Sequence, residues 1–301
     1  MSVPTTSPAS EHGVAPPGHR LPAGTSVGAV RLQVSDLDRS LAYYQRVIGL
    51  RVQERSDGVA LLGAEDGPAL VQLHERAGAQ PVPRRGRLGL YHYAILLPDR
   101  PALGRFVRHL AELDVRAGMS DHLVSEAIYL TDPDGLGIEV YVDRPRNTWQ
   151  YEGRQLVMDT RPLDVDGLLR AAGGAPWTGA PSGTVIGHVH LFVGDLERAA
   201  AFYHAGLGLD KTVWNYPGAL FMSAGGYHHH LGTNTWAAGA APAGEGDARL
   251  LAWELVVPTA ADAAAALASI ESQGTTVEPS PDGGVGRDPW GTPVHVRAIR
   301  R

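Results

Sequence analysis

The sequence predicts an α+β fold made of tandem βαβββ modules, four in the chain, and three observations lead to this fold class. A chain of 301 residues with 44% hydrophobic content is long enough to bury two cores. In each half of the chain, a strand pattern, a helix pattern and further strand patterns follow one another twice. Residues 27–50 also recur at a constant spacing as residues 186–209, and the residues of the first copy that are identical in the second are Gly28, Val30, Leu32, Val34, Asp36, Leu37, Arg39, Ala42, Tyr44, Gly49 and Leu50.

The first module opens with a strand and a helix. Residues 27–34 alternate apolar and polar side chains with the period of two that is typical of a strand. Asp36 can cap the helix that follows, and Gly49 can end it because glycine tolerates a left-handed backbone. Two more strands are expected near residues 60 and 70, which completes the module.

The other modules repeat this order. The second has a strand in GLYHYAILLPD, a helix capped by Asp99, and closing strands in HLVSEAIYLTD and LGIEVYV. In the second half, ARLLAWELVVPT precedes an alanine-rich helix and TPVHVRAI closes the chain. We number the modules one to four, over residues 27–75, 89–143, 186–236 and 248–299.

These modules set the expected organisation of the chain. We expect a flexible N-terminal segment over residues 1–23 and two domains, each holding one repeat, over residues 24–146 and 184–301. Residues 147–183 are mixed in composition and punctuated by glycine and proline, which indicates a long structured linker.

Composition excludes several classes of protein. The net charge of −6 is mild and no block of Lys or Arg offers a phosphate-binding stripe, so nucleic acid is not an expected partner. No apolar run approaches 18 residues and the N-terminal residues lack the apolar core of a signal peptide, so we expect a cytoplasmic protein without a membrane span. The absence of cysteine excludes disulfides and thiolate sites.

The chain has thirteen histidines, and their positions in the two repeats bear on metal binding. The second repeat has His188 and His190 where the first has Ala29 and Arg31. This asymmetry between otherwise similar copies predicts one metal site in the chain rather than two.

The motifs that the modules share are similar to those of a known family. The pattern V-x-DL-x-R-(S/A), then (Y/F)Y and LGL, and the strand after D-P-x-G resemble the vicinal oxygen chelate superfamily. That superfamily includes glyoxalase I, bleomycin-resistance proteins, fosfomycin-resistance enzymes and type I extradiol dioxygenases. The resemblance covers most of residues 24–299, and it implies a fold more specifically than a reaction.

The resemblance also implies where a metal would bind. In this superfamily two modules pair around a metal, and each can offer a ligand from its first strand and another from its last. Those positions hold His92 and Glu139 in module two and His188 in module three. Two histidines and one carboxylate suit Fe(II), or Mn(II), with open positions for a chelating substrate and O2. This set requires modules two and three to pair.

A competing set pairs modules three and four. It consists of His188, His295 and one of the histidines 228–230. Three imidazoles would suit zinc or copper as well as iron.

Further residues in module two resemble the signature of type I extradiol dioxygenases. The stretch from His122 to Glu139 contains the family's histidine, then Tyr129, then D-P-x-G and the ligand glutamate. The resemblance implies catalytic roles for His122 and Tyr129. One position departs from the pattern, because Met119 stands where the family usually has glycine.

Module three carries three consecutive histidines in GGYHHHLGTNTW. On a strand, His228 and His230 would share one face and His229 would point to the other. The resemblance implies an acid–base histidine here, and we assign it to His228, with His229 and His230 as alternatives.

The resemblance therefore implies an extradiol ring-cleaving dioxygenase that acts on a catechol with O2. Two other readings stay open: a glyoxalase-like lyase or isomerase, which would need a fourth ligand from Gln72 or the histidine cluster, and a metal-free binding protein of the bleomycin-resistance type. Family members often associate, so a homo-oligomer is possible. We expect the aromatic residues Trp214, Tyr216 and Phe221 in the core rather than in a pocket.

Overall fold

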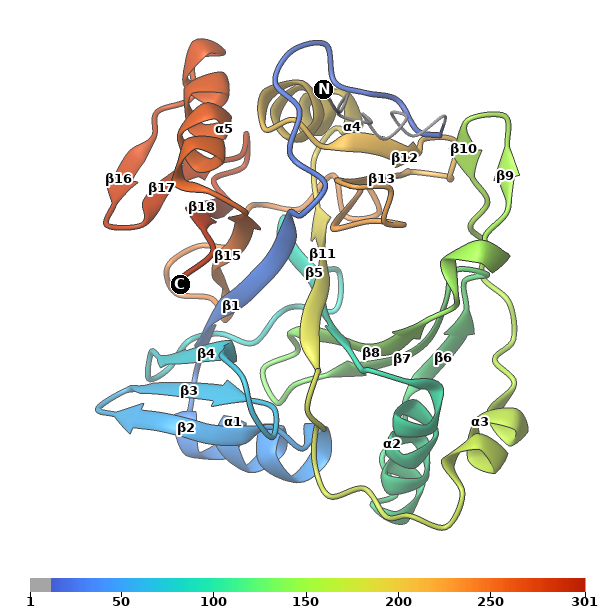
Figure 1. Ribbon diagram of the computed structural model, residues 1–301. Helices are drawn as coiled ribbons and strands as arrows, with labels where there is room; N and C mark the ends of the chain where they lie inside the picture. Colours follow the sequence, from blue (N-terminus) through green and yellow to red (C-terminus); the bar gives the residue numbers. More distant parts are fainter. Residues whose placement is uncertain (1–11, 301) are drawn as a thin grey trace, which may run out of the picture.

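The computed structural model describes residues 12–300. Modules one and two each have one helix and four strands, in the predicted order (Figure 1). Module one consists of β1 (Ser26–Val34), α1 (Leu37–Tyr43), the π-helical turn η1 (Tyr44–Ile48), β2 (Arg51–Ser56), β3 (Val59–Gly63) and β4 (Ala69–Glu75). Module two consists of β5 (Gly89–Leu96), α2 (Arg100–Glu112), β6 (Gly118–Asp121), β7 (Ser125–Thr131) and β8 (Gly137–Asp143).

The second repeat follows the same plan. Module three consists of β11 (Val185–Phe192), α4 (Leu196–Ala200), the π-helical turn η3 (Ala201–Gly206), β12 (Asp210–Val213), β13 (Ala219–Ser223) and β14 (Leu231–Asn234). Module four consists of β15 (Arg249–Val257), α5 (Ala260–Ser272), β16 (Glu278–Ser280), β17 (Gly283–Arg287) and β18 (Pro293–Ala298). Between the repeats lie a 3-10 turn η2 (Arg146–Thr148), the hairpin β9 (Tyr151–Glu152) and β10 (Gln155–Leu156), and α3 (Val165–Ala172).

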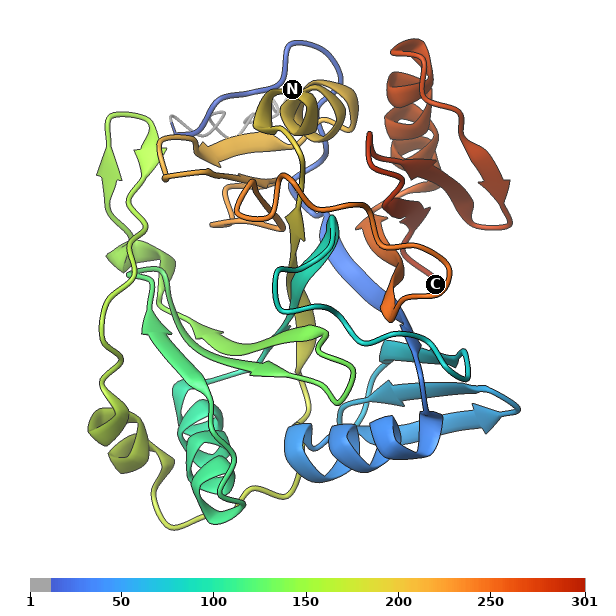
Figure 2. The ribbon, with the colours of Figure 1, turned by 180° about the vertical axis from the view of Figure 1, so that it is seen from behind.

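The strands form two curled eight-stranded sheets, which confirms the α+β fold of tandem modules (Figures 1 and 2). One sheet has the order β16-β17-β18-β15-β1-β4-β3-β2, and the other has the order β12-β13-β14-β11-β5-β8-β7-β6. At the centre of each, the first strands of two modules pair antiparallel, β1 with β15 and β5 with β11. Module one is therefore joined to module four, and module two to module three.

This pairing means that the two half-barrels do not coincide with the two repeats. Each repeat gives one module to either sheet. The linker is long enough to allow this exchange, and α3 within it packs against α2. The linker is structured, as its composition indicates.

The first helix of each repeat ends in a wider turn than the sequence suggests. Asp36 caps α1 by accepting from the backbone of Arg39, as expected, but the helix continues as a π-helical turn up to Gly49, which has φ 85°. The wide turn holds the ring of Tyr44 fully inside the core. The second repeat has the same π-helical turn, η3, and its buried Tyr203 donates a hydrogen bond to Asp288 at 3.0 Å.

The N-terminal segment is only partly covered by the structure, since residues 1–11 lie outside the described residues. The segment from residue 12 onward, expected to be flexible, is held against module three. Val14 and Lys211 exchange two backbone hydrogen bonds, and Arg20 forms a bidentate ion pair with Asp210 at 2.8 Å. Burial of Leu21 adds an apolar contact that a free segment would lack.

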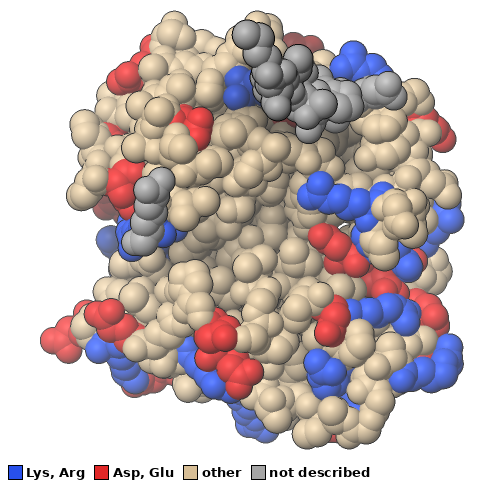
Figure 3. Space-filling view, in the orientation of Figure 1, with Lys and Arg blue, Asp and Glu red and all other residues tan. Residues whose placement is uncertain are grey.

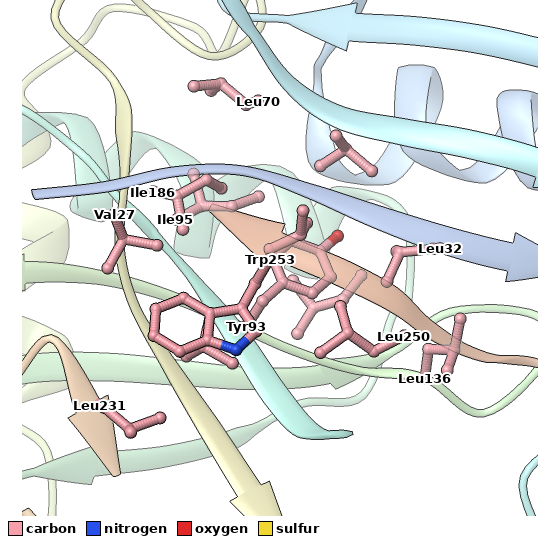
Figure 4. Packing of buried hydrophobic residues seen from close by; sticks show 14 of the residues in the cluster. Val27, Leu32, Leu70, Tyr93, Ile95, Leu136, Ile186, Leu231, Leu250 and Trp253 are labelled. Atoms are coloured by element: carbon pink, nitrogen blue, oxygen red, sulfur yellow. The ribbon is translucent and has the colours of Figure 1, made fainter. Parts of the chain in front are cut away.

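One large cluster of buried apolar side chains joins the two sheets. Its members come from the central strands of both, including Tyr93 of β5 and Trp253 of β15 (Figure 4). Because the cluster is continuous, the two half-barrels support each other rather than folding as separate units.

The surface has no strongly one-signed face in the view of Figure 3. Acidic and basic side chains lie interspersed around the rim, and the middle of this face is mostly uncharged. None of the helices in residues 12–300 combines the length and apolar character needed to cross a membrane.

Candidate active site

The curled sheet of modules two and three brings His92, Glu139 and His188 together. His92 lies on β5, Glu139 on the neighbouring parallel strand β8, and His188 on the antiparallel strand β11. The Nε2 atoms of the two histidines are 3.3 Å apart. The Oε2 atom of Glu139 is 3.0 Å from Nε2 of His92 and 3.1 Å from Nε2 of His188. All three side chains are buried.

This triangle fits a divalent metal ion. Ligand atoms at about 2.1 Å from a cation and at right angles to one another lie about 3.0 Å apart, close to the three sides observed. Two imidazoles and one carboxylate on one face leave the opposite positions of an octahedron free, as in non-haem Fe(II) oxygenases. The donor set and its spacing therefore suit iron or manganese.

The electrostatics of the triangle also favour the metal-binding forms of its members. Burial lowers the pKa of His188 to about 4, although the Glu139 carboxylate opposes this shift. Burial would raise the pKa of Glu139, but the His188 and His92 imidazoles outweigh it and hold that pKa well below its ordinary value. Neutral imidazole and ionised carboxylate are the states that coordinate metals.

A β-bulge at Gly187 aims His188 into this site. In the pairing of β11 with β5, Ile186 faces Ile95 and His188 faces Ala94, so Gly187 is the extra residue. A Cβ atom at Gly187 would lie 1.8 Å from the hydroxyl of Tyr141. Only glycine therefore allows the strand to bend here, which explains its presence at this position.

The two residues that resemble the dioxygenase signature form a pair at the rim of the triangle. Tyr129 Oη lies 2.7 Å from His122 Nε2, and His122 Nδ1 lies 2.8 Å from the carbonyl oxygen of Asp159. A carbonyl can only accept, so Nδ1 carries the proton and the neutral ring accepts from Tyr129 through Nε2. Burial, followed by the nearby Glu139 carboxylate, raises the pKa of Tyr129 well above its ordinary value. Met119 does not prevent this geometry.

The three consecutive histidines lie in the turn before β14, not on a strand. His229 lines the pocket, and its ring centroid is 4.1 Å from that of His188. His228 is fully buried behind it, with Nδ1 2.7 Å from Nδ1 of His229 and Nε2 2.9 Å from Oδ1 of Asp143. His230 accepts from the backbone of Ala224 through Nδ1. The geometry thus brings His229, rather than His228, to the pocket wall.

These hydrogen bonds define which nitrogen of His229 is free. A carboxylate oxygen only accepts, so His228 donates to Asp143 through Nε2–H. A neutral His228 then accepts through Nδ1, and His229 must donate through its own Nδ1–H. The Nε2 atom of His229 is left with a lone pair on the pocket side of the ring. Burial, followed by the nearby His188, holds the pKa of His229 well below its ordinary value, so this neutral form is the stable one.

The pocket beside the triangle has a volume of about 230 Å³. Its wall includes Tyr216 and Phe221, which we expected in the core, whereas Trp214 is 41% exposed at the surface. Sequence reasoning did not select seven other lining residues, namely Tyr91, Ser120, Ser125, Met158, Thr160, His190 and Trp236. Of these residues, only His190 could have been found from the sequence, because it follows His188 by two positions on the same strand and so shares its face.

The competing ligand sets are not brought together. His295 lies on β18 of the other sheet, where Nε2 is 2.8 Å from Ser280 and 3.1 Å from Asp282. Gln72 lies on β4 of that same sheet. Within residues 12–300, the triangle at His92 is the only cluster of potential metal ligands of this kind.

In the other half-barrel, the strands that correspond to β5, β8 and β11 carry an ion-pair network, and His295 takes the place of Glu139. Arg297 donates to Glu254 Oε2 at 2.7 and 2.9 Å, and Arg31 approaches Oε1 at 3.6 Å. The small side chains of Ala29 and Ala252 take the places of His188 and His92. A guanidinium thus neutralises the buried carboxylate in this half-barrel. The single metal site stays a prediction.

Comparison with known proteins agrees with this geometry. The model of the Glyoxalase/Bleomycin resistance protein/Dioxygenase superfamily matches residues 26–140 and 185–295. The chain belongs to this superfamily. The two matched ranges correspond to the two repeats, so each repeat matches the superfamily's model by itself.

Individual members of the superfamily resemble the chain to different degrees. A catechol-2,3-dioxygenase of Bacillus subtilis is 49% identical over 221 residues, which cover 72% of this chain and 77% of the relative. The solved structure of a proposed dioxygenase from Bacillus subtilis has a TM-score of 0.65 at 16% identity and covers 94% of this chain and 87% of that one. Glyoxalase I from Zea mays has a TM-score of 0.53 at 18% identity, with 91% and 92% covered. The two solved structures show that their folds are similar to the fold of this chain. The catechol-2,3-dioxygenase is similar to this chain in sequence.

Proposed function

We propose that the protein is an extradiol ring-cleaving dioxygenase that opens a catechol with O2 at an Fe(II) ion, or Mn(II), held by His92, Glu139 and His188. The observation that carries the proposal is the buried ligand triangle, which opens into a pocket lined by a neutral histidine and a tyrosine–histidine pair. The 49% identity to a protein named catechol-2,3-dioxygenase supports the same reaction.

A bound metal ion would supply the redox chemistry of O2 and hold the two neighbouring oxygens of the catechol. The protein supplies the ligand geometry and limits water. The linker contributes to this exclusion, since Met158 and Thr160 line the pocket and Thr160 Oγ1 lies 3.0 Å from Tyr216 Oη. With a wall of Tyr91, Phe221 and Trp236, the pocket suits one flat aromatic ring.

His229 is the group that removes a proton from the catechol. Its Nε2 lone pair faces the pocket, and its Nδ1 proton can pass to His228 Nδ1 when Nε2 takes a proton from the substrate. His228 then becomes an imidazolium ion paired with Asp143, at the 2.9 Å distance observed. Since the Asp143 side chain is 29% exposed, the charge that results lies close to solvent. Return of the proton through the same hydrogen bonds makes His229 an acid later in the cycle.

Tyr129 has a different task. Its hydroxyl donates to His122, so the phenolic oxygen keeps a lone pair that can accept from a substrate hydroxyl. Because burial and Glu139 raise the pKa of Tyr129, the hydroxyl stays protonated, so its proton remains in the hydrogen bond to His122 and its oxygen stays a positioned acceptor for the substrate hydroxyl.

The geometry favours this reaction over the two alternatives. A glyoxalase-like enzyme would need a fourth ligand. Gln72 belongs to the other sheet, and within residues 12–300 the group of potential ligands holds His92, Glu139 and His188 but no histidine of residues 228–230. A metal-free binding protein would have no use for three buried ligands with atoms 3.0–3.3 Å apart, because desolvated polar groups without a partner ion are costly.

The experiment that tests the proposal is the reaction of Fe(II)-loaded protein with catechol in ¹⁸O2. We expect a yellow ring-opened product that contains both atoms of one O2 molecule, and no product from the His92→Ala variant. The Arg105→Gln variant, at a half-buried position of α2 outside the pocket, serves as a matched control that keeps activity. Failure of Fe(II)- and Mn(II)-loaded protein to consume O2 with any catechol would overturn the proposal.

A further inference from the structure

The pocket continues into a larger cavity at the mouth of the half-barrel. This outer cavity has a volume of about 1240 Å³ and shares Tyr91, His92, Tyr129 and Trp236 with the inner pocket. The two spaces therefore adjoin each other at these four side chains. The inner pocket of about 230 Å³ lies below the range of roughly 300–1000 Å³ that is usual for larger ligands, so it suits a single ring. The outer cavity has room for a substituent that the ring would carry.

The walls of the outer cavity differ from those of the inner pocket. Near the shared residues the wall is apolar, with Leu90, Ile138 and Phe192. The same lining includes three exposed arginines: Arg84, Arg85 and Arg116. No Asp or Glu is among the described residues that line this cavity.

The three arginines have no acidic partner among the described residues. None of them forms an ion pair or side-chain hydrogen bond within the part of the chain that the structure describes, whereas the neighbouring Arg87 lies 3.6 Å from Asp247. Acidic residues outnumber basic ones in the sequence, 32 to 26. Three unpaired cations around one cavity therefore form a local positive region in a protein of net negative charge.

Two segments supply these arginines. The connection between β4 and β5, residues 76–88, crosses the middle of the view in Figure 2 and carries Arg84 and Arg85. Arg116 follows α2, just before β6. Both segments belong to the first repeat, and they face the end of β14 and the residues after it, which contribute Trp236.

We infer that the natural substrate is a catechol whose ring carries an extended side chain ending in a carboxylate. This inference rests on the proposed function and adds the substrate class. The ring would occupy the inner pocket, the side chain would follow the apolar wall, and its carboxylate would meet the arginines, which bind carboxylates through paired N–H groups.

The test compares two catechols that differ in one charge, 3-(3,4-dihydroxyphenyl)propanoate and its methyl ester. We expect kcat/KM for the acid to exceed that for the ester by about tenfold or more, the effect of one charge-assisted hydrogen bond. High salt should reduce this ratio because exposed charges are screened. The Arg84→Gln, Arg85→Gln, Arg116→Gln triple variant should bring the ratio close to one, while Arg170→Gln on the distant helix α3 should leave it unchanged.

Equal kcat/KM values for acid and ester, or a preference that survives in the triple variant, would overturn the inference while leaving the proposed function intact. If no catechol is cleaved, the proposed function fails, and calorimetric binding of 3-phenylpropanoate and its methyl ester then decides the inference separately. Preferential binding of the acid that is lost in the triple variant would support the arginine site, and equal binding of the two would refute it.

Discussion

Replacing Asp143 by Asn tests the hydrogen-bonded chain behind His229. The Asp143 carboxylate accepts from His228 Nε2 at 2.9 Å, and this bond fixes the proton positions on both histidines. An amide has no charge, and its NH₂ group can donate to Nε2 and so reverse both tautomers. His229 would then present an N–H to the pocket instead of a lone pair.

The size of the effect follows from the bond that is lost. A hydrogen bond to a charged group contributes about 1.5–3 kcal/mol, which corresponds to a fall in kcat of about 10- to 150-fold. KM should change little, since Asp143 does not line the pocket. The assay is steady-state cleavage of catechol by the Fe(II)-loaded variant across pH, with metal content measured on the same samples.

Tyr227→Phe is the matched control. Tyr227 donates to the same carboxylate oxygen at 3.0 Å but takes no part in the tautomer argument, so its removal should change kcat by less than about threefold. The reasoning is refuted if Asp143→Asn keeps the kcat and pH profile of the wild type, or if both variants lose activity equally.

Three further predictions concern the metal, the pH dependence of stability and the backbone. Glu139→Gln should lower Fe(II) affinity at least about 100-fold, because it removes the anionic ligand, and iron retained after gel filtration would contradict this. Burial raises the pKa of Asp132 to about 7, well above the value of about 3.9 in an unfolded chain. Its contribution to stability should therefore be complete below about pH 4 and be lost, by roughly 4 kcal/mol, as the pH rises through 7. Urea unfolding should show that Asp132→Asn removes this dependence. Gly187→Ala would force Tyr141 to move and should cost about 1–3 kcal/mol in the same experiment, whereas Gly174→Ala, with open space around its Cβ, should cost less than about 1 kcal/mol.

The sequence predicts the module order well because each signal is local. Alternation in residues 27–34, the cap at Asp36 and the stop at Gly49 each depend on a few neighbouring residues, and each corresponds to a feature of β1, α1 or η1. The pairing of modules is not local. It depends on which first strands meet across more than a hundred residues, and only the ligand types at His92, Glu139 and His188 pointed to modules two and three.

The histidine cluster shows where pattern reasoning stops. The period of two applies to a strand, but β14 begins at Leu231, after the cluster. In the preceding turn, consecutive side chains can face each other, as the Nδ1 atoms of His228 and His229 do at 2.7 Å. Nothing in the three letters HHH distinguishes a turn from a strand, so the pocket residue could not be chosen from the sequence.

Cross-repeat pairing has a consequence for how the polypeptide could be divided. Module two lies before the exposed turn at Gly173 and Gly174, and module three lies after it. A cut at this turn would therefore leave each fragment with only half of the candidate active site. A chain nicked at this turn would stay active only while its two pieces remained associated. Dilution alone would then abolish turnover, and mixing the separated pieces would restore it with second-order kinetics.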